Sequence, residues 1–173
     1  RHIFIKLENN LILHNFYIPA GGDIPDIDTN SKFKYKIDFM KEVINFFKKD
    51  KSNLKIMLGD FNIAPGENDV WSHKQLLNVV SHTKIETEYF TDLLLKGCWH
   101  DIVRLKKGED EKIYSWWSYR NQNWKKSNRG RRLDHILISS DLISLVNDVN
   151  IHKYIRDIQK PSDHVPISIT IDL

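Results

Sequence analysis

Apolar segments separated by a short polar turn open the chain and predict two neighbouring strands. Residues 3–7 and 11–18 are rich in Ile, Leu, Phe and Tyr, and the turn-forming sequence Glu-Asn-Asn lies between them. Apart from His14 and Asn15, the segment 11–18 is apolar, which predicts a central position in a sheet. The apolar run 54–58 has the length of a further buried strand.

Between these strands, apolar positions at steps of three and four predict a long helix. One face of this helix holds Phe33, Ile37, Met40, Ile44 and Phe47. Ser31 is its expected N-cap, because a serine side chain can accept a hydrogen bond from the first helical turn. Two further helices are expected over 72–80 and 86–96.

The last third of the chain is mainly strand-like. Strands are expected over 113–119, 133–140, 150–156 and 165–173, and a short helix over 139–146. Strands that alternate with helices, followed by several strands in a row, predict an α/β fold with a mixed sheet. Because no repeat or linker divides the sequence, we expect one domain over residues 1–173.

The distribution of charge changes this picture more than the total charge does. The net charge is only +3, yet residues 104–132 hold ten basic and three acidic residues. Such segregation favours a phosphate-rich partner, although a solvated basic loop has the same composition. No run of about 18 apolar residues indicates a membrane span. The single cysteine, Cys98, fits a reducing compartment and is expected to fill a small space in the core.

Short polar residues gather at the predicted strand ends. Asp60 and Asn62 follow the run 54–58, Asp134 begins an apolar run, and Asp163 and His164 precede the last strand. Ligands of α/β sheets bind at such ends, so these side chains could converge in one pocket. Carboxylates suit Mg²⁺ or Mn²⁺, and a histidine oriented by a carboxylate can transfer protons, which favours metal-assisted hydrolysis of a phosphate ester. Each residue alone is also a common turn or capping residue.

Four motifs carry a more specific signal. They are GDFNIAP at 59–65, YSWWSYR at 114–120, NRGRRLDHIL at 128–137 and KPSDHVPI at 160–167. In sequence, order and spacing they resemble the exonuclease III family of abasic-site endonucleases, within the endonuclease/exonuclease/phosphatase superfamily. The resemblance implies a mixed-sheet α/β sandwich and a Mg²⁺- or Mn²⁺-dependent DNA-repair phosphodiesterase that uses in-line attack of water. It also implies double-stranded DNA with abasic sites or 3′ ends as the partner, and a monomeric, cytoplasmic bacterial protein.

The resemblance implies a role for each residue that matches the family motifs. Asp60 would position or deprotonate the attacking water, or serve the leaving oxygen, while Asn62 and Tyr17 would contact the scissile phosphate. Asp134 would orient His164. The residues expected near the metal ion are Asp163, Asp60, Asn62 and His164.

The residues expected to contact DNA lie in the basic third quarter of the chain. They are Trp116, Arg120, Lys125, Lys126, Asn128, Arg129 and Arg131. Arg120 and the segment KKSNRGRR at 125–132 would bind phosphates, and Asn128 would shape that loop. Trp116 would line a pocket for the baseless sugar; since adjacent strand residues face opposite ways, either Trp116 or Trp117 is expected to be buried.

The sequence departs from the family pattern at its beginning. The family domain has a further N-terminal portion, with an asparagine and then a glutamate that is a principal Mg²⁺ ligand, and Glu8 lies in the wrong place to replace it. We therefore expect an N-terminally truncated domain that is weak or inactive as a nuclease on its own. One alternative is a remnant that binds DNA without cutting it. Another is a different phosphoesterase of the superfamily, which would share GDFN and SDH but is not expected to carry YSWWSYR and the basic loop.

Overall fold

A five-stranded mixed sheet forms the centre of the molecule in a computed structural model that describes residues 1–50, 54–121 and 123–173. In spatial order its strands are β1 (His2–Lys6), β2 (Ile12–Tyr17), β3 (Lys55–Asp60), β7 (Asp134–Ile138) and β4 (His100–Asp101). The pair β2 and β3 is parallel and every other neighbouring pair is antiparallel. The predicted α/β class with a mixed sheet is therefore confirmed.

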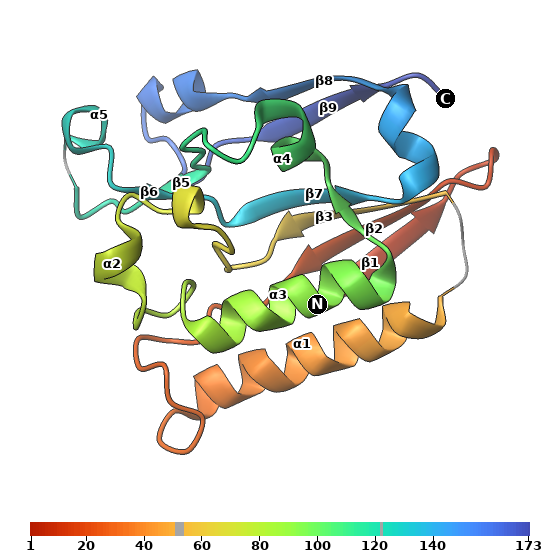
Figure 1. Cartoon of the computed structure of the whole chain (residues 1–173). Coiled ribbons are helices and arrows are strands. Elements are labelled where there is room, and N and C mark those ends of the chain that lie inside the picture. The colour runs from red at the N-terminus through yellow and green to blue at the C-terminus, as the bar shows by residue number, and fades with distance from the viewer. Residues whose placement is uncertain (51–53, 122) are drawn as a thin grey trace.

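Two helices cover one face of this sheet (Figure 1). Helix α1 (Ser31–Lys49) connects the parallel strands β2 and β3, as a crossover must, and α3 (Lys84–Gly97) lies beside it. Alternate strand residues such as Phe16, Met57 and Leu137 point to the helices and pack against their apolar stripes.

The opposite face of the sheet packs against a two-stranded sheet of β8 (Val146–Ile151) and β9 (Ile167–Ile171). The intervening residues of the same strands, among them Ile56, Ile136 and Ile138, form this second core with Val146 and Val149. The molecule is thus a sandwich of two sheets with helices on the outside, which is the predicted architecture.

Shorter elements complete the chain. The helices are α2 (His73–Leu76), α4 (Ile102–Lys107) and α5 (Trp124–Ser127); the 3₁₀ helices are η1 (Glu67–Asp69), η2 (Ser140–Leu145) and η3 (Lys153–Asp157); and β5 (Trp116–Trp117) pairs with β6 (Gly130–Arg131). No helix in the described ranges is both long and apolar enough to cross a membrane.

Several local expectations from the sequence are wrong. The N-cap of α1 is Asn30, whose side chain accepts a hydrogen bond from the Lys32 backbone N–H, so Ser31 is already the first helical residue. The helix expected over 72–80 shrinks to α2, and the strands expected over 113–119 and 150–156 form only in part. Cys98 is exposed, because it ends α3 in a left-handed conformation instead of filling the core.

One end of the sandwich gathers the features that define the site. The strands β2 and β3 end there, and β7 and β9 begin there (Figure 1). The elements α2, β5, β6 and α5 surround the same end. Side chains from segments far apart in sequence therefore meet at this edge.

Candidate active site

Three polar side chains stand in a row across the ends of neighbouring strands. Tyr17 on β2 is the register partner of Asp60 on β3, and Asp60 is the register partner of Asp134 on β7. Paired residues point to the same side of a sheet, so the register alone places the three side chains beside one another. Tyr17 lies at the outer end of this row, 45% exposed, with the Arg1 guanidinium 4.9 Å from its ring centroid.

The turn after β3 fixes the carboxylate of Asp60. Asn62 has a left-handed backbone, φ 52°, which folds the chain back on the strand end. Its backbone N–H donates to Asp60 Oδ1 at 2.8 Å, and its side-chain Nδ2 donates to Asp60 Oδ2 at 3.0 Å. The same Nδ2 donates to the Ile18 carbonyl oxygen at 2.9 Å, which ties the turn to the end of β2. Asn62 thus holds Asp60 in place.

Gly59 allows β2 to approach this turn closely. Its φ is 132°, and a Cβ atom built on it would lie 2.0 Å from the Phe16 carbonyl oxygen. We expect Gly59→Ala to lower the free energy of unfolding by about 1–3 kcal/mol, through backbone strain alone, and by more if β2 must shift.

Denaturant unfolding of the two variants Gly59→Ala and Gly108→Ala separates the cost of backbone strain from the cost of the clash with β2. Gly108 also has a positive φ, 88°, but no atom lies within 4 Å of a Cβ built on it. The loss of stability in Gly108→Ala therefore measures backbone strain without a steric clash. Equal destabilisation by both changes would contradict the close approach at Gly59.

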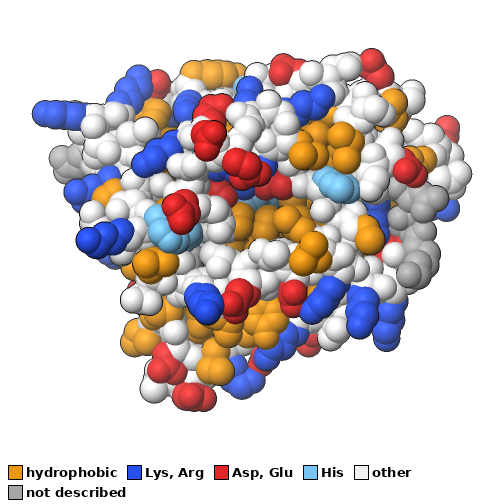
Figure 2. All heavy atoms as spheres, viewed as in Figure 1, with side chains coloured by type: hydrophobic (Ala, Val, Ile, Leu, Met, Phe, Trp, Pro, Cys, Tyr) orange, Lys and Arg blue, Asp and Glu red, His pale blue; other side chains and the backbone are white. Residues whose placement is uncertain are grey.

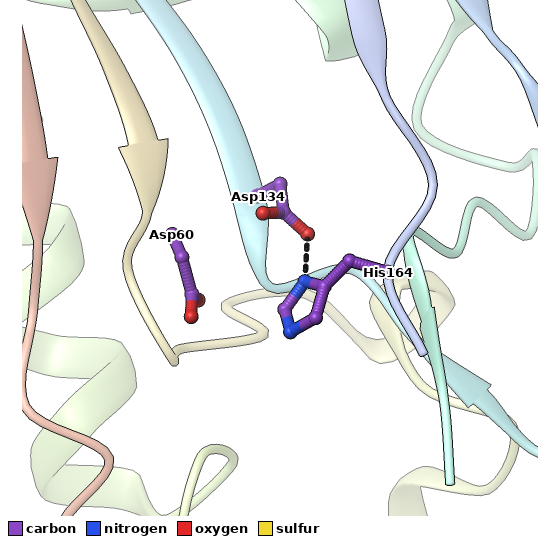
Figure 3. A group of neighbouring side chains, drawn as sticks. All are labelled: Asp60, Asp134 and His164. Atoms are coloured by element: carbon purple, nitrogen blue, oxygen red, sulfur yellow. Dashed lines mark hydrogen bonds and ion pairs between the residues drawn. The ribbon is translucent and has the colours of Figure 1, made fainter. Parts of the chain in front are cut away.

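His164 and Asp134 form a hydrogen-bonded pair beside Asp60 (Figure 3). The Nδ1 atom of His164 lies 2.8 Å from Asp134 Oδ2, so the carboxylate accepts the Nδ1 proton and leaves Nε2 on the open side of the ring. Burial opposes the charge on His164, but its hydrogen bond to Asp134 and the surrounding negative charge outweigh burial and raise the pKa of His164.

Asp134 is itself held by a residue that the sequence did not single out. The buried Ser115 hydroxyl accepts hydrogen bonds from the backbone N–H groups of Leu133 and Asp134, both at 3.0 Å. Ser115 lies in the YSWWSYR motif, but a lone serine between aromatic residues gives no periodic signal. Its role follows only from the contact between the two distant segments.

The electrostatics of the site favour a bound cation. Burial and then the neighbouring Asp134 carboxylate raise the pKa of Asp60 to about 6. Asp60, Asp134 and His164 each offer a ligand atom within 4.8 Å of the others. Carboxylate oxygens with one imidazole fit a hard divalent cation such as Mg²⁺ or Mn²⁺, which would relieve the repulsion between the carboxylates.

Asp163 lies beside this group, with its carboxylate turned to another partner. Its Oδ2 accepts a hydrogen bond from Trp116 Nε1 at 2.9 Å, and its backbone oxygen accepts one from Trp117 N–H at 2.9 Å. His164 forms a β-bridge with Trp116. The segment that carries His164 is therefore fastened to β5, and the role of Asp163 near a metal ion stays a prediction.

A cavity opens next to His164 and Asn62. Its lining includes Trp116, Leu133 and the three arginines Arg120, Arg129 and Arg131. Trp116 is half-buried and faces this cavity, whereas Trp117 is buried and packs with Tyr114 and Val165. The strand geometry thus exposes Trp116 to the cavity; its contact with a baseless sugar stays a prediction.

The family can be read from comparison with known proteins. The model of the Endonuclease/Exonuclease/phosphatase family matches residues 16–164. The chain belongs to this family.

Individual members of the family resemble the chain over most of its length. Exodeoxyribonuclease III of Haemophilus influenzae is 33% identical over 165 residues, which are 91% of this chain and 60% of that protein. A solved AP endonuclease from Archaeoglobus fulgidus superposes with a TM-score of 0.91 at 27% identity, and a 3′ phosphatase from Neisseria bound to a product DNA hairpin with 0.89 at 26%. Both superpositions cover 100% of this chain and 65% of the other. The chain therefore spans 60 to 65% of the length of these family members.

The basic side chains of the segment 125–132 lie partly on the surface and partly in the interior of the protein. Lys125 and Lys126 lie exposed on α5, where Lys125 pairs with Asp157 at 2.8 Å. Figure 2 shows Lys and Arg side chains gathered at the edge of the molecule where α5 lies. Asn128 has a left-handed backbone and accepts a hydrogen bond from Trp117 Nε1 at 3.1 Å, so it shapes the loop. Contacts of these residues with DNA stay predictions.

Arg132, expected from the sequence to bind phosphate with its neighbours, is instead fully buried. Its guanidinium pairs with the buried carboxylates of Asp69 and Asp101, and Arg104 adds a further ion pair to Asp69. The pattern NRGRR cannot show which arginine turns inward, because the choice depends on two aspartates 63 and 31 residues away in sequence.

This buried ion-pair network predicts a loss of stability in acid. Burial opposes ionisation of Asp101, but the charge of Arg132 outweighs it and holds the pKa of Asp101 below its usual range; the pKa of Asp69 is lowered in the same way. The unfolded chain therefore binds more protons below pH about 4. We expect urea unfolding to show full stabilisation above that pH and a progressive loss as the pH falls further. The variant Asp101→Asn should show a shallower pH dependence, and an unchanged profile would contradict the assignment.

Proposed function

We propose that this protein hydrolyses phosphodiester bonds of DNA with a divalent cation, in the manner of exodeoxyribonuclease III. The observation that carries the proposal is the pair of His164 and Asp134, with its hydrogen bond of 2.8 Å, beside the raised-pKa carboxylate of Asp60. Relatives named exodeoxyribonuclease III and AP endonuclease support DNA as the substrate, with abasic sites and 3′ ends as the points of attack.

In the proposed reaction, water attacks the phosphorus atom in line with the bond that breaks. Asp60, with a pKa of about 6, is mostly ionised at neutral pH and can accept a proton from that water. His164 carries its Nδ1 proton on the side of Asp134, so its Nε2 is directed to the phosphoryl group or its water. Tyr17, at the exposed end of the row, would contact a phosphate of the DNA.

Of the three neighbouring residues Asp60, Asp134 and His164, the two carboxylates would hold the cation, because His164 uses Nδ1 for Asp134 and keeps Nε2 for the phosphoryl group. Bound there, Mg²⁺ or Mn²⁺ would offset the negative charge that builds on the phosphoryl oxygens. Asn62 supports the site by fixing Asp60, because its side-chain Nδ2 donates hydrogen bonds to Asp60 Oδ2 and to the Ile18 carbonyl oxygen. Its direct hydrogen bond to the phosphate, like the cytoplasmic location and monomeric state expected from the sequence, stays a prediction.

Single-turnover cleavage of a labelled duplex tests this function. The substrates are a duplex with one tetrahydrofuran abasic site and a duplex with a recessed 3′ end, each incubated with excess protein and Mg²⁺, Mn²⁺ or EDTA. Slow cleavage is expected with either metal ion, because the chain spans only 60 to 65% of the length of its relatives, and is expected to be lost with EDTA and in Asp60→Asn. Absence of metal-dependent cleavage of both duplexes, or equal cleavage by Asp60→Asn, would refute the proposal.

A further inference from the structure

Helix α1 carries a lysine in the middle of its buried face. Lys36 shares this face with Phe33, Ile37 and Met40, and its side chain is fully buried. Lysine is almost never fully buried without a partner, and here its ammonium group forms an ion pair with the equally buried carboxylate of Glu86 on α3. Burial of two charges costs so much free energy that apolar residues of similar size are often as stabilising. The stability of the fold alone therefore does not account for this pair.

The other hydrogen bonds of Lys36 lead to the candidate active site. Its Nζ donates to the Asn62 carbonyl oxygen at 2.7 Å and to the Ala20 carbonyl oxygen at 3.4 Å. Asn62 is the residue whose backbone N–H and side chain hold the Asp60 carboxylate. Gly21 packs on the lysine stem, because a Cβ atom built on it would lie 3.0 Å from Lys36 Cδ. One ammonium group thus joins the segments that follow β2 and β3.

Glu86 holds a third segment, the turn before α3. Its carboxylate accepts hydrogen bonds from the Ser81 backbone N–H at 2.9 and 3.0 Å. It also accepts hydrogen bonds from the backbone N–H and the hydroxyl of Thr83, at 3.1 and 2.7 Å. The Ser81 carbonyl oxygen accepts a hydrogen bond from the Ala64 N–H at 2.7 Å. The turn after β3 is therefore joined to this third segment both directly and through the ion pair.

Two of the residues held in this way have a strained backbone. Asn62 has φ 52° and Ser81 has φ 89°, values that are uncommon for residues other than glycine. Both residues line the cavity beside His164. Such strain persists only where surrounding contacts enforce it, and it gathers at functional sites. The buried ion pair supplies contacts to both residues.

We propose that Lys36 and Glu86 are positioning residues for the proposed hydrolysis, with Lys36 setting the place of Asn62 and hence of the Asp60 carboxylate. Neither side chain of the pair is exposed, so both act through the turns that they bind. A displacement of a reacting group by about 1 Å can slow a reaction by about 10²-fold, so a small shift of Asp60 is enough for a measurable effect. The inference rests on the proposed function, because it assigns Asp60 a part in the reaction.

The double variant Lys36→Met/Glu86→Gln separates positioning from stability. Glutamine can still accept hydrogen bonds from Ser81 and Thr83, and no charge of the pair is left buried alone, whereas the Asn62 carbonyl oxygen loses its donor. Single-turnover cleavage of the abasic-site duplex is measured with Mn²⁺ over a range of excess protein concentrations. We expect the maximal rate constant to fall about 10–100-fold and the half-saturating protein concentration to change less than about threefold.

Amide hydrogen exchange followed by NMR provides a readout that does not depend on activity. The Asn62 N–H, which donates to Asp60 Oδ1, is expected to exchange at least about tenfold faster in the double variant relative to the Met57 N–H in the middle of β3. A loss of global stability alone would not raise this ratio, so the ratio reports on the turn after β3.

Arg104→Met is the matched control. Arg104 is also a buried cation, paired with Asp69, and its side chain donates further hydrogen bonds to the Gly108 and Glu111 carbonyl oxygens. None of these four residues lines the cavity beside His164. This variant should lower stability but leave the rate constant of the folded protein and the exchange ratio unchanged.

Glu86→Gln alone provides a second, milder variant. It leaves the Lys36 hydrogen bond to the Asn62 carbonyl oxygen in place, so it should keep more of the rate than the double variant does. Circular dichroism and thermal unfolding establish that each variant is folded.

The possible failures are distinguishable. A folded double variant that cuts like the wild type, or whose Asn62 N–H keeps its protection, would overturn the positioning role. A change confined to the half-saturating concentration, or an equal loss of rate in Arg104→Met, would overturn it as well. Failure of the wild type to cut either duplex with a metal ion would refute the proposed function, and the exchange ratio would still decide whether Lys36 holds the turn at Asn62.

Discussion

Replacing His164 by glutamine is expected to slow single-turnover DNA cleavage by about 10²–10⁴-fold while the fold stays intact. Glutamine keeps a polar side chain of similar reach but cannot take up or release a proton at neutral pH. A positioned acid or base typically accelerates a reaction by about 10²–10⁴-fold, so a loss of this size is expected. The rate constant is measured with excess protein on the abasic-site duplex. His152→Gln is the matched control. The His152 ring is also hydrogen-bonded, to Ser168 Oγ on β9 at 2.8 Å, but His152 caps η3 and is not one of the neighbouring residues Asp60, Asp134 and His164.

Asp134→Asn separates positioning from proton transfer in this pair. The amide still accepts a hydrogen bond from His164 but removes the negative charge that helps to raise the pKa of His164. We expect cleavage to fall by a similar factor, the double variant to be little worse than either single one, and the His164 pKa measured by NMR to fall. Additive losses in the double variant, or full activity in either single variant, would show that the pair does not act as a unit.

Replacing Arg132 by methionine is expected to lower the free energy of unfolding by about 3–5 kcal/mol. The guanidinium is completely buried and donates to Asp69 at 2.5 and 3.0 Å and to Asp101 at 2.7 Å. Methionine fills part of the volume but leaves two buried carboxylates with a partner removed. Denaturant unfolding at pH 7 measures the change.

Lys34→Met provides the comparison for a surface ion pair. Lys34 pairs with Asp38 one helical turn away on α1, but both side chains are largely exposed. Such pairs contribute about 0–1 kcal/mol, so this variant should be close to the wild type. A loss below 1 kcal/mol for Arg132→Met would mean that the buried network adds little to stability.

The sequence predicted that Asp60, Asp134 and His164 would meet, because each lies at or near one end of a strand. The apolar run before Asp60 and the one after Asp134 predicted strands that the structure contains as β3 and β7. Antiparallel pairing of β3 with β7 then brings Asp60 and Asp134 into register, with His164 close by. Ligand-binding side chains of α/β sheets commonly lie at strand ends. This rule is enough to group the three residues, since strands are rigid and the loops that follow them reach only a short distance.

Contacts between distant loops were beyond sequence reasoning. No periodicity or motif in the sequence pointed to Ser115 or Asp69. Ser115 nevertheless fixes the backbone of Asp134, and Asp69 pairs with Arg132. The basic segment looked uniform, although Arg132 turns inward while Arg131 lies in the cavity wall. Charge composition describes a segment as a whole, and only packing decides the direction of each side chain.

The strand order also has a consequence for how the protein is made. Asp60 and Asp134 lie on neighbouring strands but 74 residues apart in the sequence, and His164 follows Asp134 after another 30. During synthesis, a chain that ends before residue 164 can pair β2 with β3 but has no histidine beside Asp134. The group of Asp60, Asp134 and His164 therefore assembles only after residue 164 has been made, and nascent chains shorter than this carry only the two carboxylates.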